Sequence, residues 1–197
     1  MSKSVVVIGE GKTEEYYLLS LKGVLKGVQI EPAIPKHSTS TKELEQMIEK
    51  SIKTGYETII CLIDMDNKQS GKNKKNYQAL KEKYNKKTFE NNGLKSSVYF
   101  IENDRCIEIW FLYHFKYTTT SFNSSDAVVK ELKRFCKNYE KTTKFLTRCG
   151  GLHQYLINHQ GDIEVARANA RKSIEEIQTE VRTRTYSQMD EFFKRIK

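Results

Sequence analysis

Acidic side chains follow two apolar runs of this 197-residue chain, and their types and spacing fit metal chemistry. Glu10 stands between two glycines directly after residues 5–8, and Asp64 and Asp66 follow residues 58–63. Three carboxylates at one place repel one another unless a cation lies among them. Oxygen-only ligands with open positions suit Mg²⁺ or Mn²⁺ rather than zinc, and these ions bind phosphate oxygens. The pattern therefore predicts a metal site for phosphodiester chemistry.

These acids can meet only if the apolar runs before them form neighbouring strands. The β-branched, apolar patterning predicts strands at residues 5–8, 28–33, 58–63 and 97–101. Helices are expected after a Thr13 cap, from residues 38–41 to a stop at Gly55, and around residues 77–84. This alternating order predicts an α/β fold with an open, mostly parallel sheet and helices on both faces. In such sheets the working residues gather at the carboxyl ends of the strands, where Glu102 also stands.

The second half of the chain has mainly helical patterning. We expect helices at residues 126–139, along an apolar stripe at 163–181, and over a short final segment at 189–196. The mostly polar residues 118–125 are the one candidate linker. We therefore expect a single domain over residues 1–197, with an α/β core at 1–116 and a mainly helical extension at 117–197.

Positive charge is concentrated in one part of the chain. The net charge is 34 − 25 = +9, and residues 67–96 hold nine lysines against two glutamates. Such a run is most often a solvated face, but its place directly after Asp64 and Asp66 also fits nucleic-acid binding. Tyr77, Tyr84 and Phe89 lie among these lysines and fit base stacking or core packing equally well. The candidate nucleic-acid-binding residues are Lys12, Lys68, Lys72, Lys74 and Lys75.

Several classes of protein are excluded or disfavoured by what the sequence lacks. No apolar run approaches the roughly 20 residues of a membrane-spanning helix. The first eleven residues do not have the pattern of a signal or transit peptide, so we expect the chain in the cytoplasm. The four cysteines are far apart, without a C-x-x-C pair, which predicts reduced thiols used for packing.

A glycine-rich turn at residues 9–13 suggests a nucleotide-binding P-loop as an alternative. The full motif G-x-x-x-x-G-K-[ST] needs a glycine where Val6 stands, inside the expected strand. Only Gly9 and Glu10 separate that strand from Gly11, too few residues to wrap a phosphate. Glu10 would also place a negative charge beside the phosphate, so the sequence disfavours this alternative.

Motifs along the chain resemble those of a known family. The run EGKTE at residues 10–14 and the run IDMD at 63–66 resemble the Toprim catalytic domain of primases, topoisomerases, RecR and OLD-type nucleases. The run NDRCIEIWFLYHF at 103–115 resembles the NPCFEIWLLLHF signature of RloB-like proteins, with Asp104-Arg105 in place of an Asn-Pro type of turn. The runs YEK at 139–141 and YSQM at 186–189 are similar to later motifs of that family.

The resemblance implies a Toprim-like fold and an antiphage or abortive-infection effector whose metal site cuts DNA or RNA. Glu10, Asp64 and Asp66 would hold a first Mg²⁺ or Mn²⁺, and Glu14 would support it or a second ion. Glu108 would complete a second site or order the helix that it begins. RloB-like proteins are encoded beside an ABC/OLD-like ATPase, RloA, which implies such a partner.

A phosphodiester transition state also needs positive charge from the protein. The candidates are Lys141, Lys12 and the residues 72–75, and Lys141 leads because it matches a family motif. The catalytic set that the resemblance implies is Glu10, Asp64, Asp66, Glu108 and Lys141.

The aromatic residues 110–115 and His114 among them fit the core better than base stacking or base catalysis. Two other functions stay open: a non-catalytic subunit that binds nucleic acid or the ATPase, and nucleotidyl transfer as in primases. The C-terminal helices can serve as a homodimer face or as a docking face for the ATPase.

Overall fold

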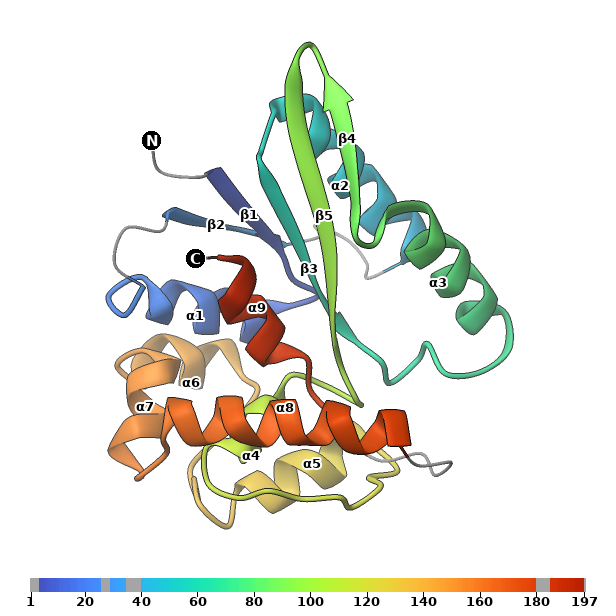
Figure 1. Ribbon diagram of the computed structural model, residues 1–197. Helices are drawn as coiled ribbons and strands as arrows, with labels where there is room; N and C mark the ends of the chain where they lie inside the picture. The colour runs from blue at the N-terminus through green and yellow to red at the C-terminus, as the bar shows by residue number, and fades with distance from the viewer. Residues whose placement is uncertain (1–3, 26–28, 35–39, 180–184, 197) are drawn as a thin grey trace.

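A computed structural model describes residues 4–25, 29–34, 40–179 and 185–196, and within them lies one five-stranded sheet (Figure 1). The strands are β1 (Ser4–Ile8), β2 (Gln29–Ala33), β3 (Thr58–Asp64), β4 (Lys87–Asn91) and β5 (Leu94–Asn103). Their order is β2-β1-β3-β5-β4; β4 is antiparallel to β5 and the other pairs are parallel. The expectation of an open, mostly parallel sheet is confirmed.

The helices in the described residues alternate with the strands and then continue without them. Before the end of β5 the chain forms α1 (Lys12–Leu21), α2 (Thr41–Thr54) and α3 (Gly71–Tyr84). After β5 it forms α4 (Glu108–Tyr113), α5 (Ser125–Leu132), α6 (Thr143–Arg148), α7 (Leu152–Asn158), α8 (Ile163–Thr179) and α9 (Met189–Arg195). In the part of the chain that the structure describes, no helix is both long and apolar enough to cross a bilayer.

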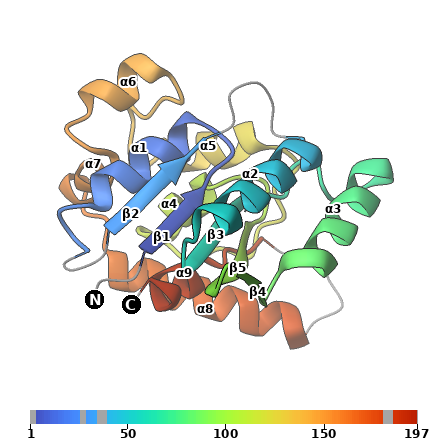
Figure 2. The same ribbon diagram turned by 90° about the horizontal axis from the view of Figure 1, so that it is seen from above.

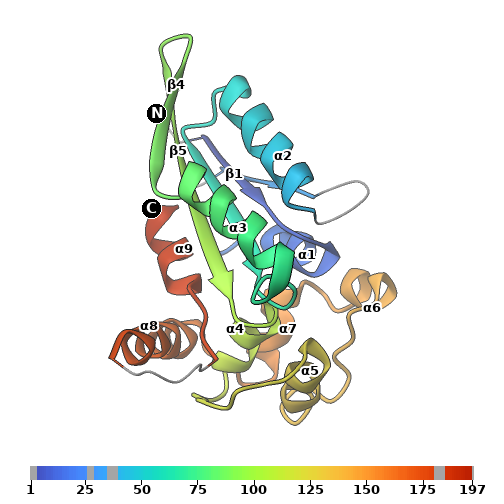
Figure 3. The same ribbon diagram turned by 90° about the vertical axis from the view of Figure 1, so that its right-hand side faces the viewer.

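Side chains of each central strand pack on both faces of the sheet, which is why the strands read as continuous apolar runs. In β1, Val5 and Val7 join a core with α1 and α4–α9, whereas Val6 and Ile8 join a core with α2 and α3. Figure 3 shows α2 and α3 on one side of β5 and α9 on the other. The sheet therefore divides the apolar residues into two packed layers.

The helical second half of the chain lies around the carboxyl ends of the strands. Figure 1 shows α4, α5 and α8 at the lower end of β3 and β5, where these strands finish. Helices α6 and α7 lie beside α1 (Figure 2). Trp110, Leu132, Leu156 and Phe192 belong to the same buried cluster as Val7 of β1. The α/β core and the helical extension thus share one hydrophobic core.

The C-terminal segment before α9 is fixed to the end of β5. Ser187 forms an antiparallel bridge with Asn103, and its hydroxyl lies 2.6 Å from Asn103 Oδ1. The backbone N–H of Asp104 donates to the carbonyl of Tyr186, and that of Gln188 donates to the carbonyl of Glu102, both at 2.9 Å. The run at 186–189 is therefore hydrogen-bonded to the carboxyl end of β5.

The turn between β5 and α4 departs from the family pattern and still leads into a helix that begins at Glu108. Arg105 takes a positive φ of 65° where the signature has proline, and its Nε donates to the carbonyl of Phe122 at 2.7 Å. Phe122 and Thr118 are buried. Residues 118–125 therefore pack onto the domain and do not form a free linker.

Several local predictions are confirmed at the residues that carry them. Ser40 caps α2 by accepting from the N–H of Glu43, and Gly55 ends that helix at φ 87°. All four cysteines are free thiols, and Cys61, Cys106 and Cys136 are buried as packing residues. The expected ends at Val28, Ser38 and Val181 lie outside the described residues.

Two local predictions are wrong, and one strand was missed. Gly11, not Thr13, is the N-cap of α1, and Thr13 lies buried in the first turn. The helix expected at 126–139 ends at Leu132, after which separate turns carry the apolar residues inward. The strand β4 was not predicted, although Asn92 and Gly93, both at positive φ, form the Asn-Gly turn that joins it to β5.

Candidate active site

A pocket of about 240 Å³ lies at the carboxyl ends of β1 and β3, where the sequence places its acids. Its lining consists of Glu10, Gly11, Lys12, Thr13, Glu14, Asp64, Glu108 and Lys141. These residues come from the β1–α1 turn, the start of α1, the end of β3, the start of α4 and the segment between α5 and α6. Four acids and two lysines of the predicted set are thus brought together.

The turn from β1 into α1 is shaped by glycine. A Cβ atom on Gly9 would lie 2.8 Å from Cβ of Glu14 and 3.0 Å from Cδ1 of Ile34, closer than side-chain carbons normally approach. The backbone N–H of Gly9 donates to the carbonyl of Ala33 at 3.0 Å. Gly9 therefore allows the first turn of α1 to pack directly against the end of β1, which carries Glu14 into the pocket.

Glu10 is paired with a lysine from the loop that follows β3. Lys68 Nζ donates to Glu10 Oε1 at 2.6 Å and to the carbonyl oxygen of Asp64 at 2.9 Å, and the Lys68 side chain is only 11% exposed. Burial raises the pKa of Glu10, and the charge and hydrogen bond of Lys68 oppose that rise. Lys68, predicted to bind nucleic acid, thus lies against the acids of the site.

Glu108 is paired with two groups from one short segment. The hydroxyl of Tyr139 donates to Glu108 Oε1 at 2.7 Å, and Lys141 Nζ lies 2.9 Å from Oε2. The Glu108 side chain is fully buried, whereas that of Lys141 is 39% exposed. Burial alone would lower the pKa of Lys141, but the charge and hydrogen bond of Glu108 together with the charges of Cys106 and Asp64 outweigh burial and raise that pKa.

Glu14 and Asp64 line the same pocket as these two pairs, and neither forms an ion pair with a lysine or arginine of the described residues. Burial and the negative charge of Glu108 raise the pKa of Glu14 to about 7. Burial, Glu14 and Glu10 hold the pKa of Asp64 well above its usual range. The charge of Lys141 lowers both pKa values without offsetting these rises, so the pocket contains two acids that no cation of the described residues pairs with directly.

The donor set fits a hard divalent cation in its chemistry, since every acidic ligand is an oxygen donor. Across residues 4–25, 29–34, 40–179 and 185–196, however, no three His, Cys, Asp or Glu side chains are already arranged to hold a metal ion. Lys68 and Lys141 explain this, because each engages one of the four acids. Glu14 and Asp64 are the two acids of the pocket without an ion pair among the described residues, so they are the residues that could hold such an ion.

Other predicted residues lie outside the pocket. Asp66 accepts a hydrogen bond at 2.9 Å from the hydroxyl of Ser125, and it does not line the pocket. Lys72, Lys74 and Lys75 are exposed on the first half of α3. Their part in nucleic-acid binding, like that of Asp66 in catalysis, stays a prediction.

Lys12 lines the pocket but points its ammonium group to Glu15 on its own helix, 2.9 Å away. Its side chain is largely exposed. It therefore lies at the rim of the pocket, where it is free to contact a ligand that extends outward.

The aromatic residues near the motifs belong to the core. Tyr77 and Tyr84 lie on the buried side of α3, and Trp110 is fully buried in α4. His114 is also buried, with Nδ1 3.0 Å from the carbonyl oxygen of Trp110, and its burial lowers its pKa to about 4. Core packing, rather than base stacking or base catalysis, accounts for these side chains.

Two residues of the site were missed or misplaced by sequence reasoning. Tyr139 was expected on the apolar face of a helix, yet its hydroxyl contacts Glu108. Lys68 was counted with the surface lysines, yet it contacts Glu10. Tyr139 stands two residues before Lys141 within one family motif, and this spacing could have identified Tyr139 as a residue of the site. Nothing in the spacing identifies the partner of Lys68.

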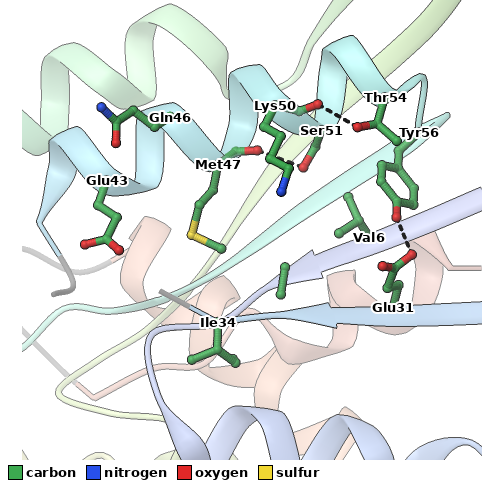
Figure 4. Close-up of a pocket in the computed structure, with 11 residues that line it drawn as sticks. Val6, Glu31, Ile34, Glu43, Gln46, Met47, Lys50, Ser51, Thr54 and Tyr56 are labelled. Atoms are coloured by element: carbon green, nitrogen blue, oxygen red, sulfur yellow. Dashed lines mark hydrogen bonds between the residues drawn. The ribbon is translucent and has the colours of Figure 1, made fainter. Parts of the chain in front are cut away.

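A larger pocket of about 550 Å³ lies between α2 and the strands β1 and β2 (Figure 4). Apolar side chains such as Val6 and Met47 line it together with polar ones. Its two acids stand at opposite ends, and Glu31 already accepts a hydrogen bond from Tyr56. Acids do not converge there, so this hollow lacks the chemistry of the smaller pocket.

Comparison with known proteins gives one match. A family model described as RloB-like protein matches residues 5–196. The chain matches no curated protein and no solved structure. The match covers all the residues that line the pocket, together with Tyr139 and Lys68.

Proposed function

The chain belongs to the RloB-like family, and from this premise we propose that it is a Mg²⁺- or Mn²⁺-dependent phosphodiesterase of the Toprim type that cuts DNA or RNA. One observation carries the proposal. Glu10, Glu14, Asp64 and Glu108 converge with Lys141 on one pocket at the carboxyl ends of parallel strands.

Asp64 and Glu14 are the residues proposed to hold the metal, with Glu10 as a third ligand. A bound divalent ion supplies Lewis-acid stabilisation of phosphate oxygens and a more acidic water. The raised pKa values of Glu14 and Asp64 support this assignment, because burial first and the neighbouring acids second make both groups costly to ionise without a cation. A bound ion would remove that cost and hold both groups as carboxylates.

Lys141 and Lys12 are proposed to bind the phosphate. The Lys141 ammonium lies in the pocket wall and is part exposed, so it can stabilise the negative charge that develops on the phosphoryl oxygens. Lys12, more exposed at the rim, suits a neighbouring phosphate. Lys72, Lys74 and Lys75 present positive charge to the nucleic-acid backbone, which positions the substrate without reading its sequence.

Family membership supports a role in antiphage defence or abortive infection beside an ABC/OLD-like, RloA-like ATPase. A second candidate function is a non-catalytic subunit that binds nucleic acid or this ATPase. The observation in its favour is that no three acids of the described residues already form a ligand set. Under the first proposal, substrate or the ATPase assists in assembling that set.

The direct test is a cleavage assay with Mn²⁺ or Mg²⁺ on labelled single- and double-stranded DNA and RNA, with and without the ATPase. We expect cleavage that requires the metal and that Asp64→Asn abolishes. Glu90→Gln, an exposed acid on β4, is the matched control and should cleave as the native chain does. Metal-dependent cleavage that survives in Asp64→Asn, or no cleavage under any of these conditions, would overturn the proposal. ATPase or nucleic-acid binding without cleavage would favour the second function.

A further inference from the structure

Glu108 differs from the other acids of the pocket because both of its carboxylate oxygens are already engaged. Oε1 accepts a hydrogen bond from the hydroxyl of Tyr139 at 2.7 Å, and Oε2 lies 2.9 Å from Lys141 Nζ. The side chain itself is fully buried at the start of α4. Glu108 lines the pocket, but Oε1 already has a hydrogen bond and Oε2 an ion pair.

Tyr139 is held rigidly, so its hydroxyl is a fixed point. The side chain is fully buried, and its ring packs edge-on against Phe111 at 6.2 Å and Phe145 at 5.6 Å between centroids. Such aromatic contacts restrict the ring as well as burying it. The hydrogen bond from this buried hydroxyl therefore fixes the position of the Glu108 carboxylate.

Lys141 is the most exposed member of this group, and it lines the pocket together with Glu108. It stands two residues after Tyr139, outside any helix, and its side chain is 39% exposed. A long lysine side chain in such a place has many rotamers in the absence of a partner. The contact with Glu108 confines its ammonium group to the pocket wall.

Use of Glu108 as a metal ligand would conflict with these contacts. A cation on Oε2 would displace Lys141 and leave its ammonium group beside a divalent ion, with repulsion between the two. As an anchor for Lys141, the same carboxylate keeps both of its partners and satisfies its buried charge.

We propose that Tyr139, Glu108 and Lys141 form a positioning chain: Tyr139 fixes Glu108, Glu108 fixes Lys141, and the Lys141 ammonium binds the phosphate of the substrate. Glu108 and Tyr139 are then positioning residues, and neither holds the metal. The assignment of phosphate as the ligand rests on the proposed function; the contacts within the chain do not.

Two binding measurements test the proposal. Calorimetry with Mn²⁺ should give Glu108→Gln and Tyr139→Phe an affinity within about threefold of the native value, whereas Asp64→Asn loses binding. Anisotropy with 12-nucleotide single-stranded DNA and RNA should show weaker binding by about 3- to 10-fold for Glu108→Gln and about 10-fold for Lys141→Ala. Lys141→Arg should recover part of that loss.

A double-mutant cycle separates positioning from a general structural effect. If Glu108 acts through Lys141, the double variant Glu108→Gln/Lys141→Ala should bind the oligonucleotide no more weakly than Lys141→Ala alone. Additive losses would overturn the proposal, as would loss of Mn²⁺ binding in Glu108→Gln. Tyr139→Phe, which removes one hydroxyl, provides a second variant if Glu108→Gln folds poorly.

A labelling measurement keeps this test independent of the proposed function. The rate at which Lys141 is acetylated, followed by mass spectrometry, should rise in Glu108→Gln and in Tyr139→Phe, while the rate at exposed Lys75 stays constant. An unchanged rate at Lys141 contradicts the positioning chain whatever the protein cuts. Absence of Mn²⁺ and oligonucleotide binding in the native chain, even with the ATPase present, would instead contradict the proposed function and the phosphate role of Lys141.

Discussion

Buried and half-buried acids lie on both faces of the sheet at its carboxyl end: Glu102 on one face, Glu14 and Asp64 on the other. The two faces differ in how the negative charge of these acids is neutralised. Glu102 of β5 accepts hydrogen bonds from the hydroxyls of Tyr77 and Tyr186 and pairs with Lys81. Across the sheet, Glu14 and Asp64 have no basic partner among the described residues.

Burial of an acid alone therefore does not identify a functional site. The hydrogen bonds to Glu102 connect α3 and the C-terminal segment to the carboxyl end of β5, which is a structural role. Glu14 and Asp64 remain short of positive charge, an arrangement that costs stability unless a ligand supplies it. The shortage of donors, more than the burial, distinguishes the candidate site.

The largest difference between variants of the two faces is expected in the cleavage rate. Asp64→Asn keeps the size of the side chain and removes its charge, so metal-dependent cleavage should fall by about 1,000-fold, or about 4 kcal/mol of transition-state stabilisation. Glu102→Gln should change the cleavage rate by less than about threefold. Equal losses in the two variants, measured as initial rates on labelled nucleic acid, would remove the distinction between the two faces.

For stability, the larger effect is expected from the variant at Glu102. Glu102→Ala leaves the hydroxyls of buried Tyr77 and half-buried Tyr186, and one lysine, without their partner, and it should lower the free energy of unfolding by about 3 kcal/mol. Glu90→Ala, at an exposed position on β4, should change it by less than about 0.5 kcal/mol. Urea unfolding followed by circular dichroism measures both, and a stable Glu102→Ala would contradict the structural role.

The pH dependence of the metal-free protein provides a third contrast. Burial and Glu108 raise the pKa of Glu14 to about 7 from an ordinary value of 4.5. A raised pKa in the folded state contributes stability that is present below pH 4.5 and lost as the pH rises through about 7. We expect Glu14→Gln to stabilise the metal-free protein by about 1 to 3 kcal/mol at pH 8 and by nothing at pH 4. A melting temperature that Glu14→Gln leaves unchanged at pH 8 would argue against crowded, unneutralised carboxylates.

The smallest effect concerns the lysine that pairs with Glu10. Lys68→Met removes the ammonium that competes for Glu10 Oε1, so Mn²⁺ affinity should rise by about 3- to 10-fold. Lys75→Met removes a charge of the same sign from the exposed part of α3, and it should leave the affinity nearly unchanged. Weaker Mn²⁺ binding in Lys68→Met would show that Lys68 supports the metal site.

Much of the candidate site could be predicted because its acids are fixed by the simplest local rules. Glu10 follows a strand, Asp64 ends one, Glu14 lies in the first turn of a helix, and Glu108 begins one. Asp66 could not be placed in this way, because the loop after β3 is held to the neighbouring turn by the N–H of Asp66 and the carbonyl of Arg105. That long-range contact carries the side chain toward Ser125.

The fold shows the same division between local and long-range causes. The parallel strands β1, β3 and β5 were predicted because apolar runs on both faces are a local signal. The expected helix over 126–139 was too long because Cys136 and Tyr139 continue the apolar stripe while their backbone forms turns. Strand β4 has mostly exposed side chains, so its pairing with β5 gave no apolar pattern to detect.

Calorimetric titration with Mn²⁺ tests the central claim most directly, using the native chain, Asp64→Asn and Glu102→Gln. The claim is that the unneutralised acids beside β1 and β3 hold a divalent ion. It predicts binding by the native chain, equal binding by Glu102→Gln, and loss of binding in Asp64→Asn. Equal binding by Asp64→Asn, or no binding by the native chain even with nucleic acid and the ATPase present, would contradict it.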